Sequence, residues 1–240
     1  MHSQSAITIK KLQSGYGQSR ILFGVDFEAK REQITVIVGP NGGGKSTLLK
    51  SIFGLCTIHK GSVEYFGNVI TKKPPYRISR MGVAYLPQIN NVFANLTTNE
   101  NLTMAAYSVN EETRLQRIKM VLESFPFLYE RFNSKANTLS GGQKQMLAMA
   151  MALMRKPRVM LFDEPTANLS PKMANEVIKK ISQIRIEFDA TIVLVEQNIH
   201  RALKIGDMAY LVVNGKLAYS GQAKNLASHP DLGRMYLGAN

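Results

Sequence analysis

Gly39, Gly44, Lys45 and Ser46 have the spacing of a phosphate-binding loop, in which lysine and a hydroxyl residue follow the second glycine. Glycines leave no Cβ between backbone and ligand, so successive N–H groups can converge on phosphate oxygens at a helix N-terminus. In this chemistry Lys45 reaches the β- and γ-phosphates of a nucleoside triphosphate, and the Ser46 hydroxyl ligates Mg²⁺. The predicted nucleotide-binding residues are Gly39, Pro40, Asn41, Gly42, Gly43, Gly44, Lys45, Ser46 and Thr47.

Two adjacent carboxylates, those of Asp163 and Glu164, follow an apolar stretch that is typical of a buried strand. A phosphate-loop protein needs an acidic residue at a strand end for Mg²⁺, which keeps part of its water shell and takes few protein oxygens. We expect Asp163 to fill that role. Glu164 is then not committed to the metal, and we expect it to polarise the attacking water as a general base.

A second glycine-rich helix start lies at residues 139–143. Ser140 is suited to cap the helix, and Gly141 and Gly142 expose N–H groups just before Gln143, so this segment predicts another anion site of the same physical kind. One chain does not need two such sites for one triphosphate. The purpose of the second site is therefore not explained by the residues alone.

The elements that must position these residues alternate between strands and helices, which favours an α/β fold with a mainly parallel sheet covered by helices. Hydrophobic spacing predicts strands at 6–11, 25–29, 34–38, 83–86, 158–163 and 191–195, with a hairpin at 62–67. It predicts helices at 45–53, 98–107, 111–124, 137–153, 172–188 and 199–204. We expect turns at 14–17 and 60–61, and we expect Pro74 and Pro75 to interrupt any helix.

The predicted helices cluster in the middle of the chain. We therefore expect one domain over residues 6–234, with a core at about 6–86 and 157–234 and a helical subdomain at about 87–156.

Composition limits the class of protein. Of 240 residues, 45% are hydrophobic and 20% are charged, which is typical of a globular chain, and the net charge of +13 predicts attraction to an anionic partner. Cys56 is the single cysteine, so no intramolecular disulfide can form and a reducing compartment is expected. The sequence shows no signal peptide and no apolar run near the roughly 18 residues of a membrane span, so at a membrane we expect it to be peripheral.

Segments 39–47, 139–143 and 160–164 stand in the order and spacing of Walker A, signature and Walker B motifs, so the chain resembles an ABC-type ATPase subunit from about residue 7 to about 237. The resemblance implies a RecA-like P-loop NTPase fold with an N-terminal antiparallel β subdomain and an inserted α-helical subdomain. It also implies ATP and Mg²⁺ as ligands. In that family two subunits pair head to tail, and the signature of one closes over the triphosphate held by the other. The implied partner is a second ATPase subunit, either a copy or a paralogue.

The resemblance assigns roles to further single positions. Tyr16 matches the aromatic residue that stacks on adenine, and Gln88 matches the glutamine that senses Mg²⁺ and the γ-phosphate. Ser170 stands in the D-loop where many members have Asp. Gln197 replaces the usual switch histidine. Because glutamine can donate a hydrogen bond to a γ-phosphate oxygen but cannot usefully accept a proton, we expect it to position and Glu164 to act as base.

Gln197, together with segments 74–78, 92–97 and 236–238, makes the chain similar to the second ATPase subunit of branched-chain, or hydrophobic, amino-acid importers. This implies a cytoplasmic subunit on the inner face of the cell membrane, bound to transmembrane permease subunits and served indirectly by an extracytoplasmic solute-binding protein. Phe93, Leu96 and Tyr107 are candidates for the groove that receives a permease helix; packing within the helical subdomain is the alternative.

Two other functions share the same ATPase motifs. One is a lipid or drug exporter, and the other is a soluble ABC ATPase that acts on ribosomes or DNA. The basic charge suits the second, but the chain carries neither tandem ATPase halves nor a long coiled-coil insertion. We therefore expect no nucleic-acid partner.

Overall fold

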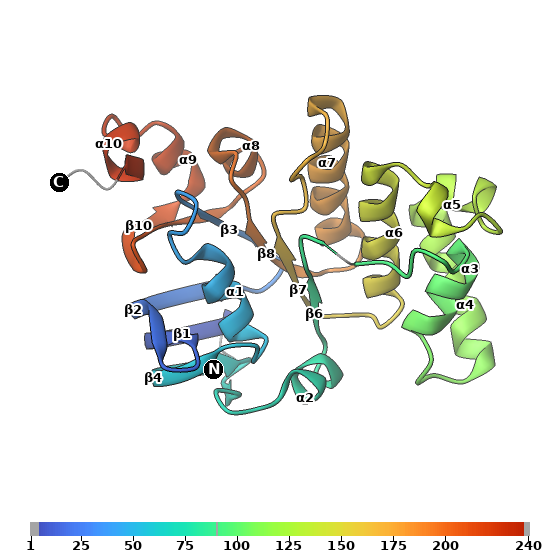
Figure 1. The fold of residues 1–240 in the computed structure, drawn as a ribbon, viewed down its shortest axis with the longest axis horizontal. Helices are drawn as coiled ribbons and strands as arrows, with labels where there is room; N and C mark the ends of the chain where they lie inside the picture. Colours follow the sequence, from blue (N-terminus) through green and yellow to red (C-terminus); the bar gives the residue numbers. More distant parts are fainter. Residues whose placement is uncertain (1–4, 90, 238–240) are drawn as a thin grey trace.

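Two β-sheets form the body of the protein in the computed structural model, which describes residues 5–89 and 91–237 (Figure 1). Gly238 of the tail segment lies outside the described residues. The first sheet is antiparallel, in the order β2-β1-β4-β5. Its strands are β1 (Ser5–Tyr16), β2 (Ser19–Lys30), β4 (Thr57–Tyr65) and β5 (Asn68–Val69).

The second sheet has the order β10-β9-β3-β8-β7-β6, and only β10 runs antiparallel to its neighbour. Its strands are β3 (Ile34–Val38), β6 (Val83–Leu86), β7 (Val159–Asp163), β8 (Thr191–Val195), β9 (Met208–Val213) and β10 (Lys216–Gln222). All residues of β3, β7 and β8 are buried, as expected of parallel strands that are covered on both faces. The predicted α/β class is therefore confirmed.

Helices cover this sheet and form a separate group at one side of it. The α-helices are α1 (Lys45–Ile52), α2 (Pro75–Arg80), α3 (Thr98–Ala105), α4 (Glu111–Ser124), α5 (Phe127–Glu130), α6 (Gly141–Leu153), α7 (Pro171–Glu187), α8 (Ile199–Leu203), α9 (Ala223–Ala227) and α10 (Leu232–Leu237), and residues Ala136–Thr138 form a 3₁₀ turn. Figure 1 shows α3 to α6 gathered at the side away from the antiparallel sheet. In the described residues, no helix has the length and apolar character needed to cross a membrane.

The strand period of two divides the core into two layers. Ile37 of β3 packs with Leu48 and Leu49 of α1 and with the antiparallel sheet, whereas its neighbours Val36 and Val38 pack on the side of α6 and α7. Because β3 packs on both of its faces, the start of the loop between β3 and α1 is fixed in position. This places residues 39–44 at the carboxyl edge of the parallel strands.

Most predicted elements are present, but several boundaries were wrong. β1 continues through the turn expected at 14–17, and the chain reverses just after Tyr16. Pro75 begins α2 at the N1 position, where its missing N–H costs nothing, so the proline pair starts a helix. The helix predicted from residue 137 starts at Gly141 because Ser140 caps it. β9 and β10 were not predicted.

The turn predicted at 60–61 is also absent, because both residues lie within β4. Gly61 has φ +87° and lies at a register shift between β4 and β1, so its left-handed backbone serves a β-bulge. A Cβ at this position would lie 2.4 Å from the Lys10 carbonyl oxygen. The hairpin predicted at 62–67 does form, with its reversal at Phe66 and Gly67 between β4 and β5.

We expect Gly61→Ala to lower the free energy of unfolding by more than about 2 kcal/mol, since it adds this clash to the roughly 1–2 kcal/mol cost of left-handed backbone. Gly67→Ala is the matched control, because Gly67 has φ +78° but open space around its Cβ position. Urea denaturation of both variants measures the difference. Equal losses would show that the bulge contact contributes nothing.

Candidate functional site

The glycine loop joins the carboxyl end of β3 to the start of α1. Gly39 has φ +147°, and a Cβ there would lie 2.1 Å from the Val212 carbonyl oxygen of β9, so only glycine fits. Gly44 is the N-cap of α1 and supplies no side-chain cap. The first N–H groups of α1 therefore point out of the helix toward the loop, which is the arrangement that favours an anion.

Lys45 carries a nearly buried ammonium in this loop, with 4% of its surface exposed. Its Nζ donates to the carbonyl oxygens of Gly39 and Pro40, both at 3.0 Å, and lies 3.8 Å from Glu164 Oε1. Burial lowers the pKa of Lys45, while the charges of Glu164 and Asp163 oppose that shift. The cation is thus fixed at the mouth of the loop, next to two carboxylates.

Asp163, the last residue of β7, accepts two hydrogen bonds. Ser46 Oγ donates to its Oδ1 at 2.7 Å, and Tyr85 Oη donates to its Oδ2 at 3.0 Å. Burial, with Asp163 adding to it, raises the pKa of Tyr85, so the phenol stays a donor. Tyr85 was not predicted as a site residue; a lone hydroxyl in an otherwise apolar strand was the available signal.

Glu164 is buried and sits in a left-handed conformation, with φ +49°. Its N–H donates to the Val195 carbonyl at the end of β8, and Gln197 Nε2 donates to its Oε2 at 2.6 Å. One carboxylate oxygen of Glu164 therefore faces Lys45, and the other is held by Gln197. The structure brings these three predicted residues together although more than 30 residues separate each from the next.

Glu196, which was not predicted as a site residue, is 2% exposed directly before Gln197. Its Oε1 accepts from the Thr166 N–H at 3.3 Å, and Arg201 Nη1 donates to the Thr166 hydroxyl at 3.1 Å. Burial raises the pKa of Glu196, against the hydrogen bonds from Thr166. These contacts tie the loop after β7 to the loop after β8.

A cavity of about 350 Å³ opens above these groups. It is lined by Ile21, Asn41, Gly42, Gly43, Gly44, Lys45, Ser46, Thr47, Gln88, Glu164 and Gln197. Ile21 was not predicted. Tyr16 is 47% exposed at the end of β1 and does not line the cavity.

The predicted second anion segment lies elsewhere in the chain. Ser140 caps α6, and its hydroxyl and the Gln143 side chain form reciprocal bonds with backbone N–H groups, at 3.3 and 2.9 Å. Gly142 packs against α7, where a Cβ would lie 2.2 Å from Met173 Cε. None of residues 140–143 lines the cavity at the glycine loop of the same chain.

A glycine loop at the carboxyl edge of a parallel sheet, a lysine inside it and a hydroxyl–carboxylate pair beneath it define a nucleotide-binding protein of the P-loop class. The family model of the ABC transporter matches residues 22–167, so the chain belongs to the ABC transporter family. The prediction of an ATP-binding, ATP-hydrolysing subunit of that family is confirmed.

Individual relatives match nearly the whole chain. The probable branched-chain amino acid transport ATP-binding protein LivF of Archaeoglobus fulgidus is 52% identical over 95% of this chain and 97% of its own length. The high-affinity branched-chain amino acid transport ATP-binding protein BraG of Pseudomonas aeruginosa is 37% identical over 97% of this chain and 99% of its own. A solved ABC transporter ATP-binding cassette in its ADP conformation superposes with a TM-score of 0.87 at 26% identity, covering 98% of this chain and 100% of that one.

We expect Glu196→Gln to stabilise the protein at neutral pH, because it removes a buried charge and keeps an oxygen for the Thr166 N–H. A carboxyl whose folded pKa is raised contributes stability below its unfolded pKa, and this contribution is lost as pH rises through the folded pKa. The gain over wild type should therefore grow from about pH 4.5 upward. Urea denaturation across this range measures it, with the exposed Glu176→Gln as control; a gain that shrinks with rising pH would contradict the argument.

Proposed function

We propose that this chain is the ATP-hydrolysing subunit of an importer for branched-chain or other hydrophobic amino acids. The substrate class is supported by the two relatives with that printed role, which align over nearly their full lengths. Uptake of radiolabelled leucine by proteoliposomes that contain this chain with permease and binding-protein subunits of a branched-chain amino-acid importer tests it. Uptake that is absent for apolar amino acids but present for another solute would overturn the substrate class.

The hydrolytic role is supported by the contact between Gln197 and Glu164 beside Lys45. In this mechanism the N–H groups of the loop and the Lys45 ammonium hold the β- and γ-phosphates. Glu164 accepts the proton of the attacking water, and Gln197 fixes the carboxylate that does so. Tyr16, which is exposed at the end of β1 and does not line the cavity, is proposed to stack on adenine.

The residues around Ser46 fit Mg²⁺. Mg²⁺ takes hard oxygen donors and needs few protein ligands at triphosphate sites. Such donors are offered by the Ser46 hydroxyl, the Asp163 carboxylate and the Gln88 amide. Bound there, the ion would neutralise charge on the β- and γ-phosphates. Ser46 and Asp163 are already hydrogen-bonded to each other, so little side-chain movement separates them from this role.

A second ATPase subunit completes the site in this proposal. Ser140, Gly141, Gly142 and Gln143 do not line the cavity of their own chain, and the exposed start of α6 is available to the triphosphate of a partner. We infer a head-to-tail pair, formed with a copy or a paralogue, in which residues 6–234 act as one ATPase unit with a core at about 6–86 and 157–234 and a helical subdomain at about 87–156.

The permease contact is proposed at a groove of about 290 Å³ between the sheet and the helical group. Phe93 and Tyr107 line it and are 51% and 70% exposed, which excludes core packing for both. Leu96 is partly buried and does not line it. Exposed aromatic residues at a groove suit an apolar helix of a membrane subunit, which supports the proposal that this chain works at the inner face of the cell membrane.

We expect Glu164→Gln to lower the ATPase rate at least about a hundredfold, the lower range for loss of a general base, and to accumulate an ATP-bound dimer. Gln197→Ala removes a positioning donor and should cost less. Phosphate release and size-exclusion chromatography with ATP measure both. A larger loss for Gln197→Ala would reverse the proposed roles, and substantial activity in Glu164→Gln would exclude it as the base.

We expect Phe93→Asp to leave ATP binding unchanged and to reduce ATP-driven uptake at least about tenfold, because a carboxylate cannot be buried cheaply against an apolar helix. Tyr129→Asp is the control, since Tyr129 is 75% exposed on α5 outside the groove. Nucleotide titration and proteoliposome uptake separate the two effects. Wild-type uptake by Phe93→Asp would place the permease elsewhere.

A further inference from the structure

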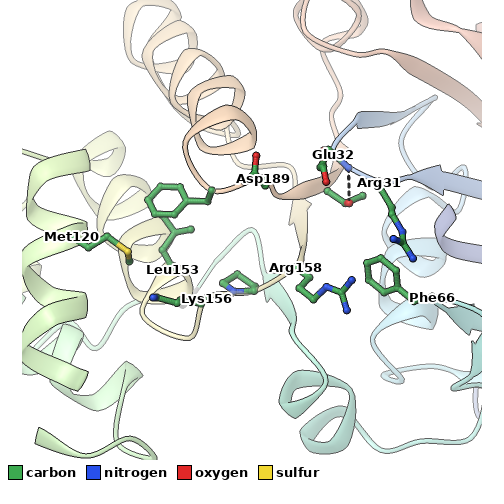
Figure 2. A pocket seen from close by; sticks show the side chains of 11 residues that line it. Arg31, Glu32, Phe66, Met120, Leu153, Lys156, Arg158 and Asp189 are labelled. Atoms are coloured by element: carbon green, nitrogen blue, oxygen red, sulfur yellow. Dashed lines mark hydrogen bonds between the residues drawn. The ribbon is translucent and has the colours of Figure 1, made fainter. Parts of the chain in front are cut away.

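A pocket of about 450 Å³ lies at the edge of the six-stranded sheet opposite to the glycine loop (Figure 2). Arg31 precedes β3, Arg158 precedes β7, and Thr191 begins β8, so the pocket faces the amino ends of strands whose carboxyl ends carry the nucleotide site. No residue lines both cavities. The pocket is therefore separate from the ATPase chemistry.

Three cations line this pocket: Arg31, Lys156 and Arg158. The guanidinium carbons of Arg158 and Arg31 lie 3.8 and 4.7 Å from the centroid of the Phe66 ring, and Figure 2 shows the ring between the two groups. Cation–π contacts orient the guanidinium groups without neutralising them. Both arginines thus keep their full charge and their N–H donors.

The described carboxylates of the same pocket do not form ion pairs with these cations. Glu32 and Asp189 also line it, but among the described residues no carboxylate oxygen lies within 4.0 Å of the three cations. An anion that enters the pocket therefore meets guanidinium groups whose charge is not offset by any described carboxylate at ion-pair distance.

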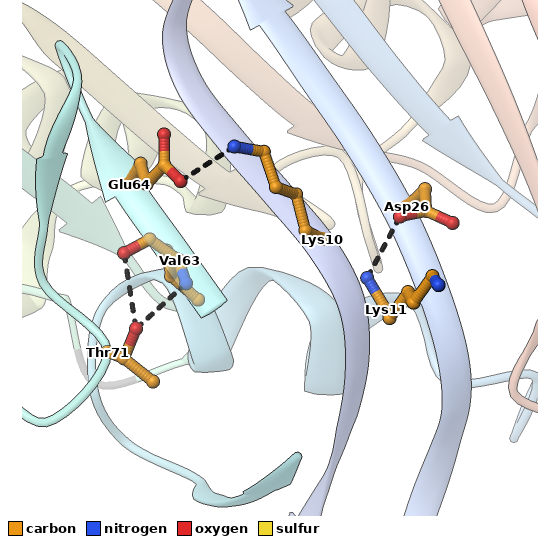
Figure 3. A network of polar contacts seen from close by, with 6 residues as sticks. All are labelled: Lys10, Lys11, Asp26, Val63, Glu64 and Thr71. Carbon is orange, nitrogen blue, oxygen red and sulfur yellow. Dashed lines mark hydrogen bonds and ion pairs between the residues drawn. The ribbon is translucent and has the colours of Figure 1, made fainter. Parts of the chain in front are cut away.

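The outer face of the antiparallel sheet gives a contrast within the same molecule (Figure 3). There Lys10 Nζ is 2.9 Å from Glu64 Oε1, and Asp26 Oδ1 accepts from the Lys11 backbone N–H at 2.9 Å. Carboxylates thus lie beside both of these surface lysines, and Lys10 forms an ion pair with Glu64. Lys10 is thus neutralised locally by an ion pair, whereas Arg31 and Arg158 at the pocket are not, in the part of the chain that the structure describes.

The opposite wall of the pocket is mainly apolar, and Lys156 lies on that side as well. Met120 of α4 and Leu153 at the end of α6 come from the helical group, and Phe188 follows α7. Figure 2 shows Met120 and Leu153 across the pocket from Arg158 and Phe66. A ligand that fills the space must combine an anionic group with an apolar part, and the volume suits a small molecule.

We propose that this pocket binds a small organic anion, with a carboxylate or phosphoryl group on Arg31 and Arg158 and an apolar part on Met120, Leu153 and Phe188. Because one wall belongs to the sheet and the other to the helical group, the bound molecule contacts both and links them. The site does not depend on which solute is transported.

The test uses the full chain with saturating MgADP, so that the glycine loop is occupied, and phenyl phosphate as the probe. Labelling methionine methyl groups with ¹³C makes Met120 an NMR reporter, assigned through Met120→Leu. We expect its signal to shift saturably below about 10 mM probe, ten times a Kd of about 1 mM. Phenol, which lacks the charge, should bind at least about tenfold more weakly if one charged contact is worth about 1.4 kcal/mol or more.

The double variant Arg31→Gln/Arg158→Gln should abolish the shift, whereas Lys11→Gln/Lys60→Gln, which removes the same charge from two exposed surface lysines, should retain it. Met120→Trp provides a second check, because it fills the pocket without changing charge; the heat of phenyl phosphate binding, measured by titration calorimetry with MgADP present, should then be lost. Equal binding of phenol, no shift with wild type, or an unchanged shift in the arginine variant would each overturn the proposal.

Discussion

The buried ammonium of Lys45 is the charge on which the nucleotide site depends. A cation that is 4% exposed is stable only with acceptors around it, and this one has two loop carbonyls and the carboxylate of Glu164. The same carboxylate is held from its other side by Gln197. Removing any of these partners leaves a buried charge without a compensating group, which is destabilising. The glycine loop, the end of β7 and the end of β8 therefore constrain one another.

Parallel topology makes this arrangement possible. β3, β7 and β8 are neighbours in one sheet, so their carboxyl ends deliver the glycine loop, the Asp163–Glu164 pair and the Glu196–Gln197 pair to one edge. The amino ends of the same strands gather Arg31 and Arg158 at the other edge. One sheet therefore presents a phosphate-binding edge and a cationic pocket that are about one strand length apart, a separation of roughly 17 Å for five residues.

The fold itself was largely predictable because its strongest signals are local. The all-apolar stretch of β7 and the regular spacing of α4 each depend on neighbours in sequence, and both elements were placed to within one residue. The wrong element boundaries arose where one residue type is compatible with two different local structures. Gly61 bends a strand at a bulge as well as it would a turn, and Pro75 starts a helix as well as it would end one. Only the partner strand or the following residues decide between them.

The sequence by itself determined the family and the residues of the glycine loop, since the spacing from Gly39 to Thr47 and the adjacent Asp163–Glu164 pair are local patterns with a chemical reason. Tertiary structure decided what surrounds them. Tyr85 reaches Asp163 only through the register of β6 on β7, and Glu196 meets the loop after β7 only because β8 lies beside it. Such contacts join residues that are 30 or more positions apart, so no local pattern can specify them.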